Sequence, residues 1–160
     1  MRLSMLSLIV IALAAEAAAA GPENRFVSGD YGISIEAPAS KNPTAGNSQI
    51  AAFFLPPSDN FSASVNIMRQ QSSESLEAFD KTQMAQFKQF KITVLNRTLM
   101  ANEARYEYKG DIQGRTFHYY LRAVRAGRYL YPVLATGLES QWEQQKPLLM
   151  KSVESFTVKP

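Results

Sequence analysis

The sequence predicts an α+β domain built as a helix–sheet–helix sandwich, with two main helices and a central antiparallel sheet of about six to seven strands. Segments of alternating apolar and polar residues follow one another with short connections, as in antiparallel sheets. Two other segments repeat their apolar residues at helical spacing. The last two predicted strands carry apolar residues on both faces, so we expect a covering layer on each side of the sheet.

The N-terminal segment Met1–Ala20 has the pattern of a secretory signal peptide. An arginine precedes the apolar run Leu6–Ala15, and Ala18 and Ala20 have the spacing that signal peptidase accepts. The apolar run is too short to anchor the chain across a ~30 Å hydrocarbon core. We therefore predict cleavage after Ala20, no stable membrane span after cleavage, and a single domain over residues 21–160. The mature protein is expected to be periplasmic or secreted.

Composition restricts the chemistry that this chain can perform. It contains no cysteine, which excludes thiol nucleophiles, iron–sulfur clusters and cysteine-ligated zinc. Its net charge of +3 favours an anionic envelope component over nucleic acid as a partner of an exported protein. A charge of this size is also common in ordinary soluble domains, so solubilisation is the alternative explanation.

The N-terminal third has the pattern of strands joined by turns. Apolar residues alternate within Arg25–Pro38, and the proline ends that strand. The segment Ala39–Gln49 consists of turn-forming and polar residues, so we expect a surface loop. The apolar run Ile50–Leu55 predicts a strand covered on both faces, and the alternating segment Phe61–Arg69 predicts the next strand.

The segment Ser75–Phe90 predicts an amphipathic helix of about four turns. Ser75 can cap its N-terminus, and Glu77 lies in the first turn, where the helix dipole favours an acidic residue. The Met and Phe stripe of this helix could line a ligand cleft, but at this spacing such a stripe usually packs on a sheet.

Four strands follow the helix, and a second helical region ends the chain. Ile92–Arg97 and Ala104–Lys109 have strand patterns and precede the two strands of Gly114–Gly137. The segment from Trp142 onward has apolar residues in helical register, but Pro147 interrupts it. We therefore predict two helical pieces, the second beginning with Pro147 in its first turn.

The segment Gly114–Gly137 predicts a hairpin of two long strands. With Arg125–Arg128 as a four-residue loop, Arg122 would lie opposite Tyr131. Pro132 would then occupy a pair without hydrogen bonds, so we expect the strand near it to be an edge strand or to be bulged.

The arginines of this hairpin are the candidate functional residues. Arg125 and Arg128 would project from its tip, and Arg122 could lie across the ring of Tyr131 as a cation–π pair. These four residues form the predicted contact with a partner or an anion, and solvated surface charge is the alternative. His118 is expected to be a hydrogen-bonded packing residue, because no second histidine and no cysteine can complete a site with it.

Established catalytic motifs are absent from the sequence. It has no nucleophile elbow, no zinc-protease helix and no phosphate-binding loop, and its carboxylates show no recognisable pairing. We therefore predict no catalytic residues, no bound metal and no cofactor.

Three motifs lie at Phe26–Pro38 (F-x-x-x-x-Y-G-I-S-I-x-x-P), at Arg105–Leu121 (the R-Y-E-Y strand and G-R-T-F-H-Y-Y-L) and at Trp142–Phe156 (W-x-x-x-x-P-L-L-x-x-S-V-x-S-F). They resemble those of PsbP-like proteins, including the bacterial exported relatives of the DcrB type. The resemblance implies a helix–sheet–helix sandwich and a non-enzymatic module, and it carries no ligand-binding residue onto this chain.

Together these observations favour a non-catalytic exported module that binds or assembles components of the cell envelope. Its partner would be an envelope protein or an anionic envelope component. Contact would be made through a sheet edge, the loop Ala39–Gln49 or the hairpin tip Arg125–Arg128. Two alternatives remain: a carrier of a small hydrophobic ligand between sheet and helix, and a small hydrolase.

Overall fold

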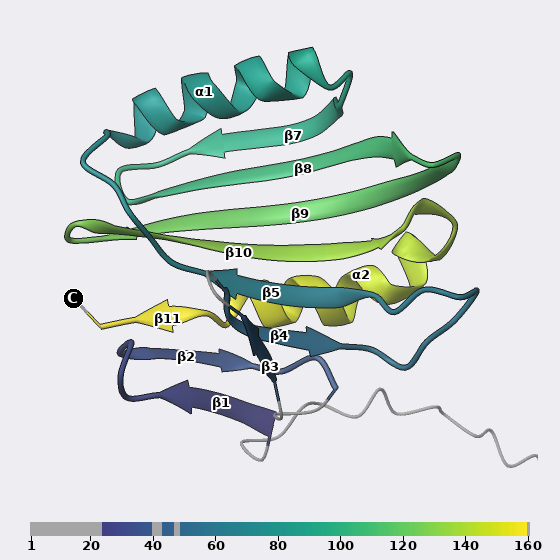
Figure 1. Cartoon of the computed structure of the whole chain (residues 1–160), viewed down its shortest axis with the longest axis horizontal. Coiled ribbons are helices and arrows are strands. Elements are labelled where there is room, and N and C mark those ends of the chain that lie inside the picture. The colour runs from purple at the N-terminus through teal and green to yellow at the C-terminus, as the bar shows by residue number, and fades with distance from the viewer. Residues whose placement is uncertain (1–23, 40–42, 47–48, 160) are drawn as a thin grey trace, which may run out of the picture.

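The computed structural model describes residues 24–39, 43–46 and 49–159. The predicted signal peptide, Met1–Ala20, therefore lies outside the described residues. Eight strands form one antiparallel sheet in the order β3-β4-β5-β10-β9-β8-β7, with the short β6 paired to β10. Three more form a small sheet in the order β1-β2-β11 (Figure 1). Within the described part of the chain, no helix is long and apolar enough to cross a membrane.

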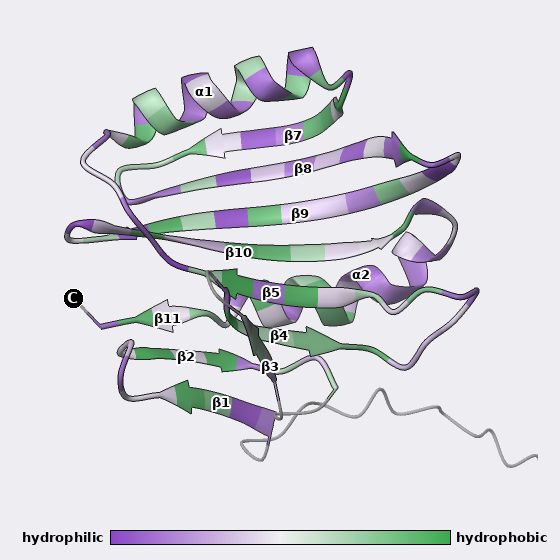
Figure 2. Cartoon of the chain, viewed as in Figure 1, coloured by the Kyte–Doolittle hydropathy of each residue, from purple (hydrophilic) through white to green (hydrophobic). Residues whose placement is uncertain are grey.

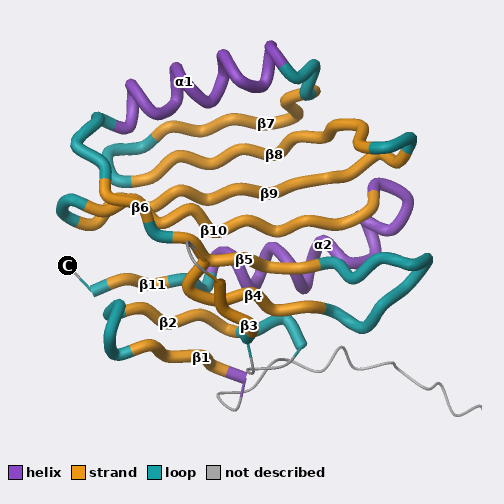
Figure 3. The backbone as a smooth tube through the Cα atoms, in the orientation of Figure 1, coloured by secondary structure: helices purple, strands orange, loops and turns teal. Residues whose placement is uncertain are grey.

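The bounds of the elements follow chain order and can be traced in Figure 3. They are β1 Arg25–Ser28, β2 Ile33–Glu36, β3 Thr44–Gly46, β4 Gln49–Phe54, β5 Ser64–Met68, β6 Gln70–Gln71, α1 Leu76–Gln89, β7 Thr93–Leu99, β8 Glu103–Ile112, β9 Arg115–Ala126, β10 Tyr129–Leu138, α2 Glu139–Glu154 and β11 Thr157–Val158.

The predicted α+β sandwich with an antiparallel sheet and two helices is confirmed. The large sheet has eight strands, slightly more than expected, because two very short strands join it. One of them, β3, lies within Ala39–Gln49, so the predicted loop is in part a strand that pairs with β4. The N-terminal hairpin β1–β2 belongs to the small sheet instead.

The two helices cover opposite faces of the large sheet. Tyr120 packs in one apolar cluster with Trp142, Leu149 and Val153 of α2. Its neighbour Leu121 packs in a second cluster with Leu76 and Phe87 of α1. Consecutive residues of a strand point to opposite faces, so one helix lies on each side of the sheet. Figure 2 shows strongly hydrophilic residues interspersed with weakly hydrophilic and hydrophobic residues along β8 and β9.

Helix α1 forms where the sequence predicted it. Ser75 is the N-cap, and its hydroxyl accepts a hydrogen bond from the Ala78 N–H at 3.2 Å. The helix ends at Gln89, after which Lys91 adopts a left-handed backbone with φ of 55°. Its Leu76 and Phe87 are buried on the sheet, as expected for the docking face of an amphipathic helix.

The prediction of two C-terminal helical pieces is wrong, because α2 continues through Pro147 as one helix of 16 residues. Proline removes the hydrogen bond to the carbonyl four residues earlier, that of Glu143. Both residues are exposed, so water can satisfy this carbonyl. Burial of Trp142 before the proline and Leu149 after it on the same sheet face outweighs the lost bond.

The register of the β9–β10 hairpin differs from the predicted one. Ala126 pairs with Tyr129, so the loop consists of only Gly127 and Arg128. Gly127 has φ of 57°, the left-handed conformation that a two-residue hairpin turn favours. The predicted division of side chains between the two faces is correct, but each residue pairs two positions away from its expected partner.

Of the two alternatives predicted near Pro132, an edge strand or a bulge, the edge strand is wrong, because β10 is a central strand. Pro132 pairs with Ala123 of β9, and β10 has β5 and β6 on its other side. Pairing on that other side stops after Ile67 and resumes at Gln70, with the register unchanged. The missing N–H of Pro132 thus coincides with a gap in the ladder.

We predict that Pro147→Ala stabilises the protein by about 1–3 kcal/mol, because alanine restores the helical hydrogen bond and has higher helix propensity. Urea unfolding measures the change, and Gln144→Ala, at an exposed position of the same helix, serves as the control. An unchanged or lower free energy of unfolding for Pro147→Ala would show that the proline is not strained in α2.

Candidate functional site

Charged side chains gather on the face of the sheet that α2 only partly covers. Helix α2 contacts β9, β10 and β5, whereas α1 contacts β7 and β8 on the opposite face. Along β8 and β9, alternate residues point toward α2, and the register places them side by side. They are Glu103, Arg105, Glu107 and Lys109 on β8 and His118, Tyr120 and Arg122 on β9.

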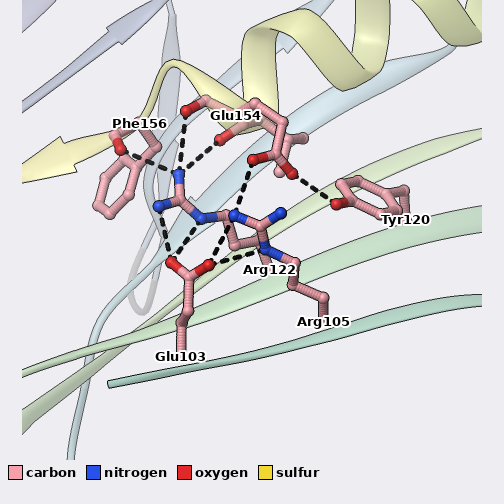
Figure 4. Close-up of polar contacts among 7 residues, drawn as sticks. Glu103, Arg105, Tyr120, Arg122, Glu154 and Phe156 are labelled. Atoms are coloured by element: carbon pink, nitrogen blue, oxygen red, sulfur yellow. Dashed lines mark hydrogen bonds and ion pairs between the residues drawn. The ribbon is translucent and has the colours of Figure 1, made fainter. Parts of the chain in front are cut away.

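Arg122 is the centre of the first polar cluster (Figure 4). Its Nε and Nη2 donate to Glu103 Oε2 at 2.9 and 2.7 Å. Its Nη1 donates to the backbone carbonyls of Glu154 at 3.0 Å and Phe156 at 3.1 Å. The Arg122 and Glu103 side chains are only 14% and 15% exposed. Arg122 therefore forms hydrogen bonds at the C-terminal end of α2 and connects that end to β9 and β8.

Arg105 and Tyr120 extend this cluster toward solvent. Arg105 Nη2 lies 2.6 Å from Glu103 Oε1 and 3.0 Å from Glu154 Oε2. Tyr120 donates its hydroxyl to Glu154 Oε1 at 2.5 Å. Burial, together with this bond to a carboxylate, raises the pKa of Tyr120. Burial alone would raise the pKa of Glu103, but the bonds and charges of Arg122 and Arg105 outweigh it and lower that pKa.

A second polar cluster surrounds His118. The imidazole stacks on the Trp142 ring with 4.1 Å between ring centroids. Its Nδ1 lies 2.5 Å from Glu139 Oε2 and its Nε2 lies 3.1 Å from Glu107 Oε1. Lys146 Nζ also contacts Glu107, at 2.9 Å. His118 is thus the hydrogen-bonded packing residue that the sequence predicted.

The carboxylates of the second cluster favour their charged forms. The pKa of Glu139 is lowered, mainly by the hydrogen bond with His118. Burial opposes ionisation of Glu107, but the hydrogen bond and charge of Lys146 lower its pKa overall. Among the described residues, no group of three or more side chains is arranged to hold a metal ion.

A small groove lies between the first cluster and the β7 edge. It measures about 150 Å³ and is lined mostly by polar residues from three strands and one helix. They are Asn96 and Thr98 of β7, Arg105, Tyr106 and Glu107 of β8, Tyr120 of β9 and Met150 of α2. Arg105 and Glu107 are already paired with other residues, so the groove is polar while its charges are largely compensated.

Strand β7 forms one edge of the large sheet. The Met100 N–H donates to the Glu103 carbonyl at 2.8 Å, and hydrogen-bonded pairs alternate along an antiparallel ladder. Arg97 and Leu99 therefore direct their N–H and C=O groups away from β8. Three apolar side chains are exposed here: Leu95 is 47%, Leu99 37% and Met100 40% exposed. This edge therefore combines backbone groups that do not pair with β8 and exposed apolar surface.

Two of the four predicted contact residues lie inside the protein. Arg122 pairs with Val133 and is engaged by Glu103, while Tyr131 pairs with Val124 and packs against Phe156. The predicted Arg122–Tyr131 cross-strand pair is therefore wrong, because the shorter loop shifts the register by two residues.

The other two predicted residues, Arg125 and Arg128, lie near the hairpin tip. Arg125 donates from Nη1 to the Ser72 carbonyl at 3.2 Å and from Nη2 to the Glu74 carbonyl. It thereby fixes the segment that leads into α1. Arg128 is exposed, with its guanidinium carbon 5.2 Å from the centroid of the Tyr129 ring. The structure thus brings the four residues to three different places.

Sequence reasoning missed two features of this region. Arg69 lies between the rings of Tyr31 and Tyr129, 4.5 Å from each centroid. The other omission is the Glu103–Arg122 ion pair. Glu103 lies just before the predicted strand Ala104–Lys109, and only the β8–β9 register brings it close to Arg122.

The architecture of this chain is similar to that of several solved structures. Cyanobacterial PsbP from Synechocystis sp. PCC 6803 superposes with a TM-score of 0.50 at 11% identity, covering 87% of this chain and 95% of that one. The chain has a PsbP-like fold. No protein-family model matches the sequence, and no curated protein matches it closely.

Two further structures share the PsbP-like fold of this chain. PA94 of Pseudomonas aeruginosa, a protein of unknown function, gives a TM-score of 0.63 at 14% identity, covering 72% of this chain and 87% of that one. A Bacteroides thetaiotaomicron protein gives a TM-score of 0.51 at 10% identity, covering 86% of this chain and 48% of that one. At these identities the likeness concerns the fold alone.

We predict that Glu103→Gln lowers the free energy of unfolding by about 2–4 kcal/mol, because it leaves the Arg122 guanidinium without its buried anion. Urea unfolding at neutral pH measures the loss. The control is Glu143→Gln on the exposed side of α2, which should change stability by less than about 0.5 kcal/mol. Equal effects of the two variants would contradict a structural role for the Glu103–Arg122 pair.

The pH dependence of stability gives an independent prediction. The pKa values of Glu103, Glu107 and Glu139 lie below their ordinary value of 4.5 in the folded protein. Their contribution is therefore fully present above about pH 4.5 and is lost as the pH falls through the folded pKa values. Urea unfolding from pH 7 to pH 3 should show falling stability, and the difference between wild type and Glu103→Gln should shrink. A constant difference would exclude this linkage.

Proposed function

We propose that this protein is a non-catalytic binding or assembly module, exported to the periplasm or secreted, that binds a protein of the cell envelope. The partner would add an extended segment to strand β7. The exposed β7 edge is the observation that carries this proposal, and the N-terminal signal pattern supports the location. The PsbP-like fold is compatible with such a module.

Addition of a strand at β7 would use the outward backbone groups and the exposed apolar side chains of this edge. The outward N–H and C=O groups of Arg97 and Leu99 can continue the antiparallel ladder, which gives affinity without requiring a particular partner sequence. Leu95, Leu99 and Met100 would bury apolar surface against the added segment. On the α2 side, the segment would run beside the groove that Asn96 and Thr98 line. Polar side chains of the partner would face this groove.

The polar clusters support binding rather than catalysis. Glu103 and Arg122 neutralise each other, and His118 contacts carboxylates through both ring nitrogens. General acid–base chemistry requires such a group to face a substrate-sized space. Asp59, Arg115 and Glu139 line a pocket of about 370 Å³. However, Arg115 pairs with Asp59, and Glu139 pairs with His118 and Lys109. Among the described residues, nothing at this pocket specifically favours hydrolysis or hydrophobic-ligand carriage.

We predict that Leu99→Pro prevents strand addition while Leu99→Ala largely preserves it. Proline removes the outward N–H at an edge position that tolerates it, whereas alanine keeps that donor. A photo-crosslinking amino acid at Thr98, in cells that naturally make the protein, should give a discrete protein adduct. Its yield should fall by at least about fivefold in Leu99→Pro. Circular dichroism checks that both variants fold.

Two results would contradict this proposal. One is an absence of any adduct at Thr98 together with an equal absence at Met100, at the end of the same edge. The other is an adduct whose yield is the same in Leu99→Pro and Leu99→Ala, which would show that the partner does not use the backbone of β7.

A further inference from the structure

The small sheet lies at the end of the molecule remote from β7 (Figure 1). Its Ile33 and Ile35 are buried, so the alternate residues point outward. The register places Val27 of β1 beside Ser34 of β2 and Thr157 of β11 on the other side of Ser34. The outward face therefore has hydroxyl groups on its central strand and on β11.

A groove of about 230 Å³ lies on this outer face. Arg25 lines it from β1, and Lys159 lines it immediately after β11, so a cation stands on each side of the hydroxyls. Gly29 and Gly32 of the β1–β2 turn line one end, and Gly32 has φ of 62°. This left-handed backbone favours glycine, whereas a Cβ at this position would make only an ordinary van der Waals contact with the Lys159 Cβ, at 3.6 Å.

Hydrogen bonds connect Arg25 to the hydroxyl groups of the groove. Arg25 Nη2 donates to Ser34 Oγ at 2.7 Å, and Ser34 Oγ lies 2.8 Å from Thr157 Oγ1. Because Ser34 accepts from Arg25, it can donate its own proton to Thr157. The Thr157 hydroxyl proton is then free to donate to a bound ligand.

The groove carries excess positive charge. Lys159 forms no ion pair among the described residues. Arg25 Nη1 lies 4.0 Å from Glu36 Oε1, and Lys151 Nζ lies 3.4 Å from the other oxygen of the same carboxylate. Among the described residues, the charged side chains that line the groove are those of Arg25 and Lys159, and both are cationic.

We propose that this groove binds a phosphate group, either free phosphate or the phosphate of a lipid headgroup. Arg25 and Lys159 supply charge-assisted donors, and the Thr157 hydroxyl supplies a third donor between them. Val27 lines the same groove with 66% of its surface exposed, so the apolar part of an attached molecule has a contact beside the phosphate. This site is independent of β7 and of the proposed protein partner.

The test is a titration of the isotope-labelled protein followed by amide NMR signals. Inorganic phosphate should cause saturable shifts at Ser34 and Thr157. The variant Arg25→Gln/Lys159→Gln should weaken binding at least about tenfold, and Thr157→Val should weaken it less. The control Lys81→Gln/Lys88→Gln removes the same charge from exposed positions of α1 and should bind as wild type does.

Vesicle sedimentation distinguishes the two sources of phosphate. Binding to phosphatidylglycerol vesicles, but not to phosphatidylcholine vesicles, that only the Arg25/Lys159 variant loses would identify a lipid headgroup as the ligand. Saturable phosphate shifts without vesicle binding would identify free phosphate. The proposal is overturned if neither probe binds, or if both double variants lose binding equally, since that would indicate only nonspecific charge attraction. The NMR spectra also report whether each variant is folded.

Discussion

The ion pair between Arg122 and Glu103 holds the second helix to the sheet. One guanidinium joins three parts of the chain: its own strand β9, the neighbouring strand β8 through Glu103, and the final carbonyls of α2. The last turn of a helix leaves carbonyls unpaired, and a buried arginine satisfies them while opposing the negative end of the helix dipole. Phe156 and the strand β11 follow directly, so the same contact also positions the small sheet.

The incomplete cover of the sheet explains why this pair has so many charged neighbours. Helix α2 contacts β9, β10 and β5. On that face of the sheet, β7 and β8 therefore lie beyond the helix. Under the helix the sheet carries Val133 and Ala135, which are fully buried. Toward β7 it carries Arg105 and Glu107, whose charges are tolerated because solvent and opposite charges are both close. The boundary between apolar core and polar groove therefore follows the edge of α2.

Sequence reasoning recovered the features that depend on local chemistry and missed those that depend on pairing between distant segments. Alternation predicted which residues of β9 and β10 share a face, and Ser75 predicted the start of α1. The loop at Gly127 was predicted too long, which misplaced every partner of β10 by two residues. The Glu103–Arg122 pair could not be predicted for the same reason, because it depends on register. Pro147 shows that tertiary burial can override a local helix-breaking signal.

Polar contacts with α1 hold the exposed edge strand β7 in place. Arg97 of β7 donates from Nε to Asp80 of α1 at 2.7 Å, and Tyr106 of β8 donates to the same carboxylate at 3.0 Å. The hydrogen bonds from Arg97 outweigh burial and lower the pKa of Asp80, so the carboxylate stays charged at neutral pH. These contacts fix β7 from the side of α1 and leave its outer backbone groups directed away from β8. An edge held in the bound conformation loses little entropy when a partner strand is added. In the binding mode proposed for β7, the buried Asp80 would position the strand and would not itself contact the partner.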